Sequence, residues 1–488
     1  MSQPLVASSQ LHIRMALLVI CAAYVFYRLN KAGGQERLPE CGLLGATKFV
    51  VYSKNVVTPK GVQAAAVSIM NGKITQVKPA KKAPRSKRRM MVLDYGDKAI
   101  LPGGIDLHAH LNEPGRADWE GFVTGTQAAA AGGITTVVDM PLNSFPTTTT
   151  LEAFDMKLEA ADGKLYVDTA FWAGLVPENA GNHSVLEALL AKGAVGFKAF
   201  MSPSGINDFP NSNKTVLRQG LEYLVKNDVP LMVHAEDPPL DAPAPEGDPR
   251  SYLAYMSSRP REWEKRAIKQ LIELAEELQP APRIHIAHLS DADNLPILAE
   301  AKARGLQITV ETCPHYLMFA AEEIPDGSTL FKCAPPIREA ENRERLWAGL
   351  EEGVIDVVSS DHSPSTPELK LLEEGDFQKA WGGISGLQMG LSATWSEGVK
   401  RNATLEKLAQ WWSTLPAQIA QLPEKGLIKK GYDADLVVLD LEEPVDTSEE
   451  AYRHKHKVSP YLGLEMYGQV HATFVRGYQM LVVPAENW

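Results

Sequence analysis

Six residues of the sequence carry side chains that could bind metal ions and use them for chemistry. They are spread along the chain: His108, His110, Lys198, His234, His288 and Asp361. Successive side chains of a β-strand point to opposite faces, so His108 and His110, two positions apart in Gly-Gly-Ile-Asp-Leu-His-Ala-His, point the same way. Asp106 shares that face. We predict that the six side chains meet in one site.

The chemistry of these six side chains points to two divalent metal ions. Four imidazoles and a carboxylate suit zinc, with manganese, cobalt or iron as alternatives. Five such ligands are too many for one catalytic zinc, but they suit a pair of ions about 3.5–4 Å apart. A pair needs a bridging anion, and no Glu stands at a strand end in a suitable place. Lys198 can supply the bridge if CO2 converts its amine into a carbamate, so we predict two ions bridged by carboxylated Lys198.

The surroundings of the six residues predict the fold that positions them. Each residue follows or ends a short apolar or β-branched run, and each run leads into a polar loop. Ligands at the C-terminal ends of several strands are typical of a (β/α)8 barrel. The segment from His108 to Asp361 has about the length of one such barrel, which is typically ~250 residues. Strands at 135–140 and 194–200 alternate with helices at 185–192, 217–227 and 263–277. We predict an α/β fold with a TIM-type barrel.

Both ends of the chain are predicted to form short strands without intervening helices. The first end has β-segments at 47–53, 65–70, 74–77 and 91–94 with an Asn71-Gly72 turn, and the other has segments at 435–439 and 472–476. We predict a small β-sandwich domain built from both ends and packed on the barrel. The predicted segments are a leader at 1–41, the N-terminal half of the sandwich at 42–101, the barrel at 102–426 and the C-terminal half of the sandwich at 427–488.

The N-terminal leader contains an unbroken apolar run at 15–27, between Arg14 and Arg28. The run is shorter than the ~20 residues of a transmembrane helix and has the length of a signal-peptide core. No clean cleavage site follows, so an uncleaved anchor and a removed signal both stay open. We predict an endoplasmic-reticulum or endomembrane location with membrane association through residues 15–27. The alternative is mitochondrial, because no acidic residue precedes Glu36.

Composition narrows the class of protein. The chain has 488 residues, is 44% hydrophobic and carries a formal net charge of −11, so it can bury one large core and a smaller one. The acidic balance argues against general nucleic-acid binding. Four cysteines with no Cys-x-x-Cys pair make neither a disulfide framework nor a structural zinc finger.

Several other His and Cys residues need an interpretation. We read His285 as structural, because it lies three positions before His288 and should face the other side of its strand. His315 and Cys313 are read as packing residues. His454 and His456 form a second His-x-His pattern. They lie in the C-terminal β-region, so we do not expect them to bind the metals. Gly382, Gly383 and Gly386 are expected to shape a loop near the site.

In the six residues and in several longer segments, the chain resembles the cyclic amidohydrolases of the amidohydrolase superfamily, and within them the allantoinases. The resemblance runs from about residue 50 to about 483. Its most specific segments are 110–116 (HLNEPGR), 119–126 (WEGFVTGT), 139–143 (DMPLN), 311–316 (ETCPHY), 332–338 (KCAPPIR), 360–364 (SDHSP), 379–388 (KAWGGISGLQ) and 452–461 (YRHKHKVSPY).

The resemblance implies a function. The expected reaction is hydrolysis of the hydantoin ring amide of allantoin to give allantoate. A metal-bridged hydroxide would attack the ring carbonyl, and Asp361 would take its proton and return it to the leaving nitrogen. Asn143 and Ser363 are candidate contacts to the hydantoin ring. The resemblance also implies a homo-oligomer, a tetramer.

Two other enzyme families and one group of non-enzymatic relatives share parts of this pattern. Dihydroorotases carry an Arg two positions after the His-x-His pair, where this chain has the neutral Asn112. Dihydropyrimidinases and hydantoinases share all six residues but usually have a Tyr after the lysine, and this chain has none there; they remain the alternative. Relatives of dihydropyrimidinase that serve in assembly and signalling have lost the ligands, and this chain keeps them.

Overall fold

A computed structural model describes residues 48–86, 90–242 and 246–482. Its eight-stranded parallel barrel has the order β13-β12-β11-β10-β9-β8-β7-β6. The strands are β6 (Gly104–Ala109), β7 (Ile134–Asp139), β8 (Asp168–Gly174), β9 (Ala194–Phe200), β10 (Leu231–His234), β11 (Ile284–Ile286), β12 (Ile308–Thr312) and β13 (Val357–Val358). Every residue of β6 and β7 is buried, as expected for strands covered on both faces.

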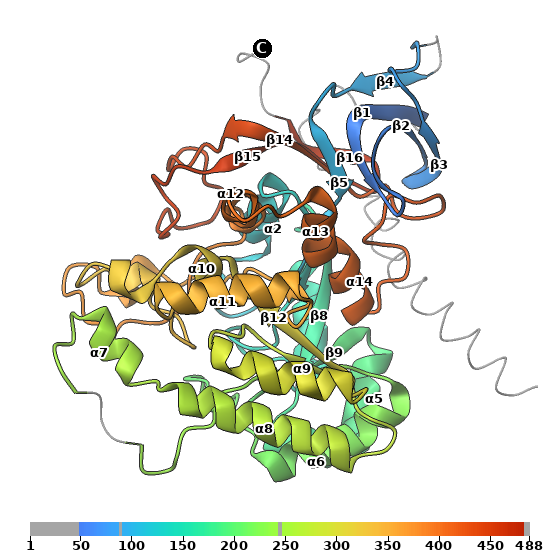
Figure 1. Ribbon diagram of the computed structural model, residues 1–488. Helices are drawn as coiled ribbons and strands as arrows, with labels where there is room; N and C mark the ends of the chain where they lie inside the picture. Colours follow the sequence, from blue (N-terminus) through green and yellow to red (C-terminus); the bar gives the residue numbers. More distant parts are fainter. Residues whose placement is uncertain (1–47, 87–89, 243–245, 483–488) are drawn as a thin grey trace, which may run out of the picture.

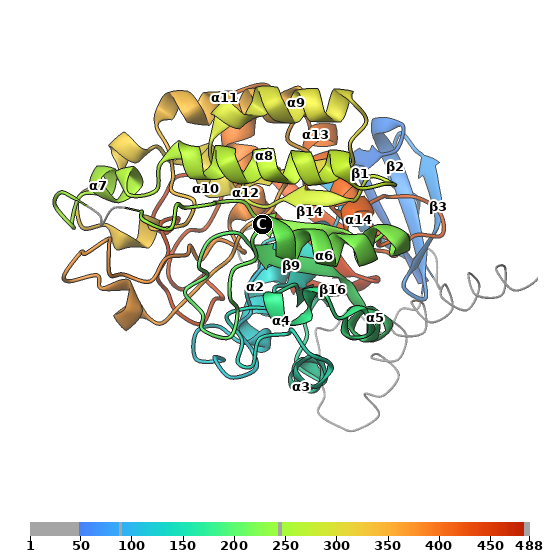
Figure 2. The same ribbon diagram turned by 90° about the horizontal axis from the view of Figure 1, so that it is seen from below.

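Helices alternate with the barrel strands and cover them. The main helices are α2 (Phe122–Ala131), α3 (Leu151–Ala161), α5 (His183–Ala191), α6 (Lys214–Leu224), α8 (Arg261–Glu277), α9 (Leu295–Ala303) and α11 (Ala340–Glu351). Figure 2 shows α8, α9 and α11 on one side of β9 and α3 and α5 on the other. The longest, α8, buries the predicted stripe of Ala267, Leu271 and Leu274.

Further α-helices lie between or after these. They are α4 (Pro177–Ala180), α7 (Tyr252–Ser257), α10 (Pro314–Met318), α12 (Gly390–Val399), α13 (Leu405–Ala409) and α14 (Leu415–Ile419). A π-helical turn at Gln410–Thr414 joins α13 to α14. The segment predicted as a helix at 217–227 is α6 followed by a single 3-10 turn at Val225–Asn227.

The barrel closes through the segment that carries Asp361. Ala109 at the end of β6 forms a parallel bridge with His362, and His110 N donates to His362 O at 2.7 Å. Asp106 also holds this junction, because Ser360 N lies 3.2 Å from both of its carboxylate oxygens. The first and last strand ends of the barrel, which carry His108, His110 and Asp361, therefore lie side by side.

The two ends of the chain meet in a second β-unit, as predicted, and its strands form one sheet in the order β16-β15-β14-β5-β1-β2-β3, with β4 beside β1. Its strands are β1 (Lys48–Thr58), β2 (Gly61–Met70), β3 (Lys73–Pro79), β4 (Met91–Asp94), β5 (Ala99–Pro102), β14 (Leu436–Pro444), β15 (Tyr467–Val475) and β16 (Tyr478–Val482). β14 joins the halves by pairing antiparallel with β5, from Leu436 opposite Pro102 to Leu439 opposite Ala99. Figure 1 shows these blue and red strands together above the barrel.

A buried ionic cluster links this sheet to the barrel. Lys425 Nζ lies 2.5 Å from Asp168 of β8 and 2.6 Å from Asp435, which precedes β14. Arg476, between β15 and β16, also binds Asp168, at 2.8 Å. Burying these charges without partners would be costly, so the cluster fixes how the two units meet.

The predicted leader and its apolar run at 15–27 lie outside the described residues. Among the residues that the structure describes, no helix is long and apolar enough to cross a membrane.

Candidate functional site

The structure brings the six predicted residues together at the C-terminal end of the barrel strands. His108 lies in β6 and Lys198 in β9, His234 ends β10, and the others lie just beyond β6, β11 and β13. All six are buried, and Lys198 has no exposed surface. This is the end of a barrel at which active sites form.

The centre of the group is Asp361. Its Oδ1 lies 3.2 Å from His108 Nε2 and 3.7 Å from His110 Nε2. Potential ligand atoms of these three residues all lie within 4.8 Å of one another. Burial lowers the pKa of His108 to about 4 and that of His110 well below its usual value, so both imidazoles are neutral. Neutral imidazoles and a carboxylate can hold a divalent cation.

Lys198 faces the same centre. Its Nζ lies 3.5 Å from His108 Nε2 and 5.2 Å from the centre of the Phe200 ring. Burial lowers the pKa of Lys198 to about 8, although nearby carboxylates oppose that shift. The neutral fraction of this amine near physiological pH is therefore far larger than that of an ordinary lysine, and only a neutral amine can react with CO2.

His234 and His288 complete the group. Their ring centres lie 4.6 Å apart, and the ring of His288 lies 5.3 Å from that of His108. Phe200 stacks on His234 at 4.4 Å. His234 Nε2 lies 2.8 Å from Glu236 Oε2, which leaves Nδ1 as the nitrogen that can bind a metal.

Glu236 was not identified from the sequence. It lies two positions after His234, is buried and forms an ion pair with Arg259. Burial alone would raise the pKa of Glu236, but the charge of Arg259 and hydrogen bonds from His234 and Arg259 lower it to about 2. An ionised carboxylate behind an imidazole fixes the orientation of the ring.

Glu311 in β12 was missed as well. His108 Nδ1 lies 2.5 Å from Glu311 Oε1, which also accepts from His288 N at 3.0 Å. His285 Nε2 lies 3.2 Å from the other oxygen, Oε2. We expected no glutamate at a strand end in a suitable place, but Glu311 lies near the end of β12. This glutamate holds the far side of His108.

The expected orientation of His285 was wrong. His285 contacts Glu311 and Thr309, so it points towards the same side chain that supports His108. Strand alternation fails here because β11 ends at Ile286 and His288 adopts a left-handed backbone conformation with φ 37°. The structural reading of His285 holds, since its two ring nitrogens are already engaged.

Asp361 has an unusual backbone too. Its φ is 43°, in the left-handed region that only Gly, Asn and Asp adopt with ease. Burial raises the pKa of Asp361 well above its usual value, and Lys198 opposes that shift. Positive charge in the centre is therefore needed to keep this carboxylate ionised.

The predicted substrate contacts lie beside His110. Asn143 Nδ2 is 3.3 Å from His110 Nδ1 and 3.5 Å from Ser363 Oγ. The expected glycine-shaped loop runs past them, because a Cβ on Gly383 would stand 2.2 Å from Ser363 O. Whether Asn143 and Ser363 bind substrate stays a prediction.

The C-terminal residues reach closer to the site than expected. His454 is buried, and its ring stacks on that of His362, the neighbour of Asp361, at 4.6 Å. His456 is only half-buried, and its Nε2 contacts Asp118 O at 2.7 Å. Neither is grouped with the six residues.

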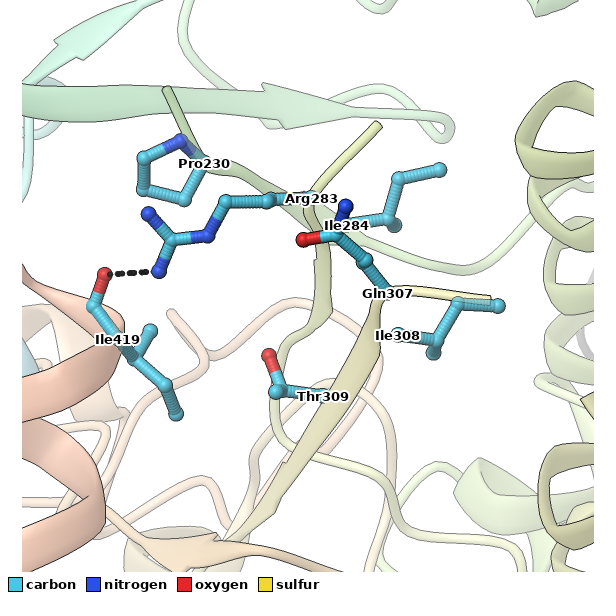
Figure 3. Close-up of a pocket in the computed structure, with 7 residues that line it drawn as sticks. All are labelled: Pro230, Arg283, Ile284, Gln307, Ile308, Thr309 and Ile419. Carbon is cyan, nitrogen blue, oxygen red and sulfur yellow. Dashed lines mark hydrogen bonds between the residues drawn. The ribbon is translucent and has the colours of Figure 1, made fainter. Parts of the chain in front are cut away.

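A separate pocket lies at the opposite end of the barrel. It has a volume of about 240 Å³ and is lined by Pro230, Arg283, Ile284, Gln307, Ile308, Thr309 and Ile419. Figure 3 shows the lining side chains, among them Ile284 and Ile308. These two are the first residues of β11 and β12, so this pocket lies at the end of the strands opposite to the six residues. Arg283 already donates to the carbonyl of Ile419.

Comparison with known proteins bears on both units. The model of the amidohydrolase family matches residues 99–480, and a model described as "Allantoinase, composite domain" matches residues 44–98. Among solved structures, an L-hydantoinase (dihydropyrimidinase) from Arthrobacter aurescens superposes with a TM-score of 0.80 at 31% identity, covering 88% of this chain and 95% of that one.

Curated relatives are similar over most of their length. The allantoinase of Arabidopsis thaliana is 49% identical, covering 95% of this chain and 93% of that protein. The allantoinase of Streptomyces avermitilis is 46% identical, covering 89% and 95%. A protein named "Allantoinase, mitochondrial" from Aquarana catesbeiana is 43% identical, covering 79% and 78%.

Proposed function

The chain belongs to the amidohydrolase family, and we propose that it is an allantoinase, which hydrolyses the ring amide of allantoin to give allantoate. The observation that carries this proposal is the similarity to allantoinases over nearly the whole chain, including the small β-domain. It is an enzyme of the hydrolase class, and its substrate is a small molecule.

The six residues fit a pair of divalent ions. Glu311 and Glu236 hold one ring nitrogen each of His108 and His234, so the remaining nitrogens are free to bind. His288 Nδ1 is buried with no hydrogen-bond partner among the described residues. The proposed bridge forms when the neutral amine of Lys198 adds to CO2 and loses a proton, giving a carbamate. Zinc is the proposed metal, with manganese, cobalt or iron as alternatives.

Bound ions would lower the pKa of a water towards ~7 and polarise the ring carbonyl. The chain itself supplies the proton carrier. The Asp361 carboxylate takes the proton of the attacking water and returns it to the departing ring nitrogen. Asn143 and Ser363 are proposed to orient the ring by hydrogen bonds. Glu311 and Glu236 keep the imidazoles aimed at the centre.

The cyclic amides hydrolysed by hydantoinases and dihydropyrimidinases are the second candidate class of substrate. The L-hydantoinase (dihydropyrimidinase) from Arthrobacter aurescens has the same fold. The neutral Asn112 disfavours dihydroorotate, whose carboxylate needs a cationic partner. In the structure the side-chain Nδ2 of Asn112 donates to Pro364 O at 3.3 Å.

The decisive experiment is a turnover assay on racemic allantoin, with the metal content measured in the same sample. Dihydrouracil, hydantoin and dihydroorotate serve as comparison substrates. We expect allantoin to be turned over with the highest kcat/KM and about two ions per chain. Faster turnover of hydantoin or dihydrouracil would replace the proposed substrate while leaving the reaction class intact.

We also propose an endomembrane location through residues 15–27, with a mitochondrial location as the alternative suggested by the name of one relative. A reporter fused to residues 1–40 tests this: a cytosolic reporter contradicts both, and a mitochondrial one supports the alternative. A homotetramer is proposed from the family resemblance and is tested by the mass of the purified protein in solution.

A further inference from the structure

A second group of ligand-type side chains lies beside Asp361. Cys313 directly precedes α10, and His315 lies within that helix. The thiol sulfur of Cys313, a ring nitrogen of His315 and a carboxylate oxygen of Asp361 all lie within 4.8 Å of one another. All three residues are buried, and Cys313 is a free cysteine. Such a compact set of thiol, imidazole and carboxylate has the composition of a metal site.

A second observation concerns the His315 ring, which shares its lack of hydrogen-bond partners with the ring of His454 among the described residues. The His315 ring has no exposed surface, and neither ring nitrogen has a hydrogen-bond partner among the described residues. Leaving a polar group buried and unpaired destabilises the folded chain. A buried imidazole of this kind calls for a partner that the protein chain does not supply, either a water or a cation.

Two other buried residues of the same types differ from this set. His285 is equally buried, but Thr309 and Glu311 engage its two nitrogens. Cys333, the other buried free cysteine among the described residues, belongs to none of the ligand groups found there. Burial alone therefore does not produce the combination seen at Cys313 and His315.

The thiol decides which cation suits the set. The six-residue centre offers imidazoles and oxygens, whereas this group adds a sulfur, which favours softer ions. We propose that Cys313, His315 and Asp361 form an accessory site for one thiophilic divalent cation, such as zinc in excess or cadmium. When the cation binds, the S–H bond of Cys313 breaks, a sulfur–metal bond forms and the proton leaves to solvent.

Sharing Asp361 gives this site a consequence for activity. The Oδ1 atom of Asp361 lies 3.2 Å from His108 Nε2, so the same carboxylate serves the six-residue centre. A cation at the accessory site draws negative charge from the proton carrier and repels the neighbouring ions. Thiophilic metal in excess therefore inhibits the enzyme, and the inhibition depends on Cys313.

The test uses the metal-loaded full chain with Cys21→Ser and Cys41→Ser, so that Cys313 and Cys333 are the only thiols. Cadmium is added stepwise while the ultraviolet thiolate-to-cadmium absorption and the bound cadmium are measured. We expect one thiolate-bound cadmium per chain. The further change Cys313→Ser should abolish the absorption and weaken binding at this site by roughly tenfold or more, whereas the matched control Cys333→Ser should change neither.

The proposal is overturned if the starting protein shows no thiolate absorption, if the absorption survives Cys313→Ser, or if it is lost with Cys333→Ser. His315→Phe provides a second variant of similar size, and it must also weaken cadmium binding. Allantoin turnover without cadmium is measured on the same samples and should be close to that of the starting protein for Cys313→Ser. Failure of turnover in all samples would bear on the proposed substrate and not on this site.

Discussion

The rings of His362 and His454 stack with their centres 4.6 Å apart and their planes 27° from parallel. His362 follows Asp361 and bridges the backbones of Ala109 and Ile384, where the barrel closes. Glu120 Oε2 lies 3.4 Å from His362 Nε2. A segment near the C-terminal end of the chain thus packs against the junction that sets the position of Asp361.

We predict that His454→Ala lowers both stability and kcat. Removing a buried ring leaves a cavity, for which losses of about 2–4 kcal/mol are typical. His454→Phe keeps the stack and should retain most of both. Denaturant unfolding and steady-state kinetics measure the effects, with the half-buried His456→Ala as control. A wild-type kcat in the His454→Ala variant would show that the stack does not position Asp361.

Glu311→Gln should weaken metal binding by about 10–100-fold, the usual effect of removing a group that holds a metal-binding imidazole. Gln has nearly the same size but cannot place a negative charge against His108 and His285. The measurement is a competition titration with a chelator. Glu397→Gln, in α12 and paired with Arg401, is the matched control and should not change the affinity. Equal affinities in the two variants would contradict the role given to Glu311.

The sequence was sufficient to predict the barrel, the two-ended β-domain and the meeting of the six residues. Each of these depends on local patterns, such as a short apolar run that ends in a polar residue, or the Asn71-Gly72 turn with both φ angles positive. The partners of those residues could not be predicted in the same way. Glu311 meets His108 across the barrel, and no local pattern encodes such a contact.

The orientation of His285 and the position of His454 were not predicted, because both depend on structure beyond local sequence patterns. His285 was assigned to the wrong side because strand alternation was extended past the end of β11, where His288 adopts a left-handed conformation. The approach of His454 to His362 depends on the path of the whole C-terminal segment. Periodicity carries no information about such a path.

The reactivity of Lys198 should depend on pH with a midpoint near 8. Burial lowers its pKa to about 8, so the neutral, CO2-reactive form increases as the pH rises through that value. Metal-free enzyme is reloaded with zinc at constant dissolved CO2 over a pH series, and recovered activity is measured. Recovery that rises only near the ordinary lysine pKa would contradict this. Lys198→Arg should recover nothing, because its guanidinium stays charged.

Glu236 should contribute stability that is lost in acid. Its folded pKa of about 2 lies below the ordinary value of 4.5, so its contribution is complete above about pH 4.5 and disappears as the pH falls towards 2. We predict that metal-free Glu236→Gln is less stable than the wild type at pH 7. The difference should shrink as the pH is lowered below 4.5. Denaturant unfolding at several pH values measures it, and a constant difference would contradict the ionised Glu236–Arg259 pair.

Asp361→Asn separates the proton-carrying role of Asp361 from its structural role. Asn tolerates the left-handed backbone at this position, so the variant should fold, whereas Ala would add strain. Asn cannot take a proton from the attacking water, and we expect kcat to fall by about 10²–10⁴-fold. Stability and metal content are measured on the same sample. Asp356→Asn, which loses a contact to Lys302 near β13, is the control and should reduce stability rather than kcat. If Asp361→Asn binds its metals and loses less than about threefold in kcat, which is far below a general-base effect, another group carries the proton.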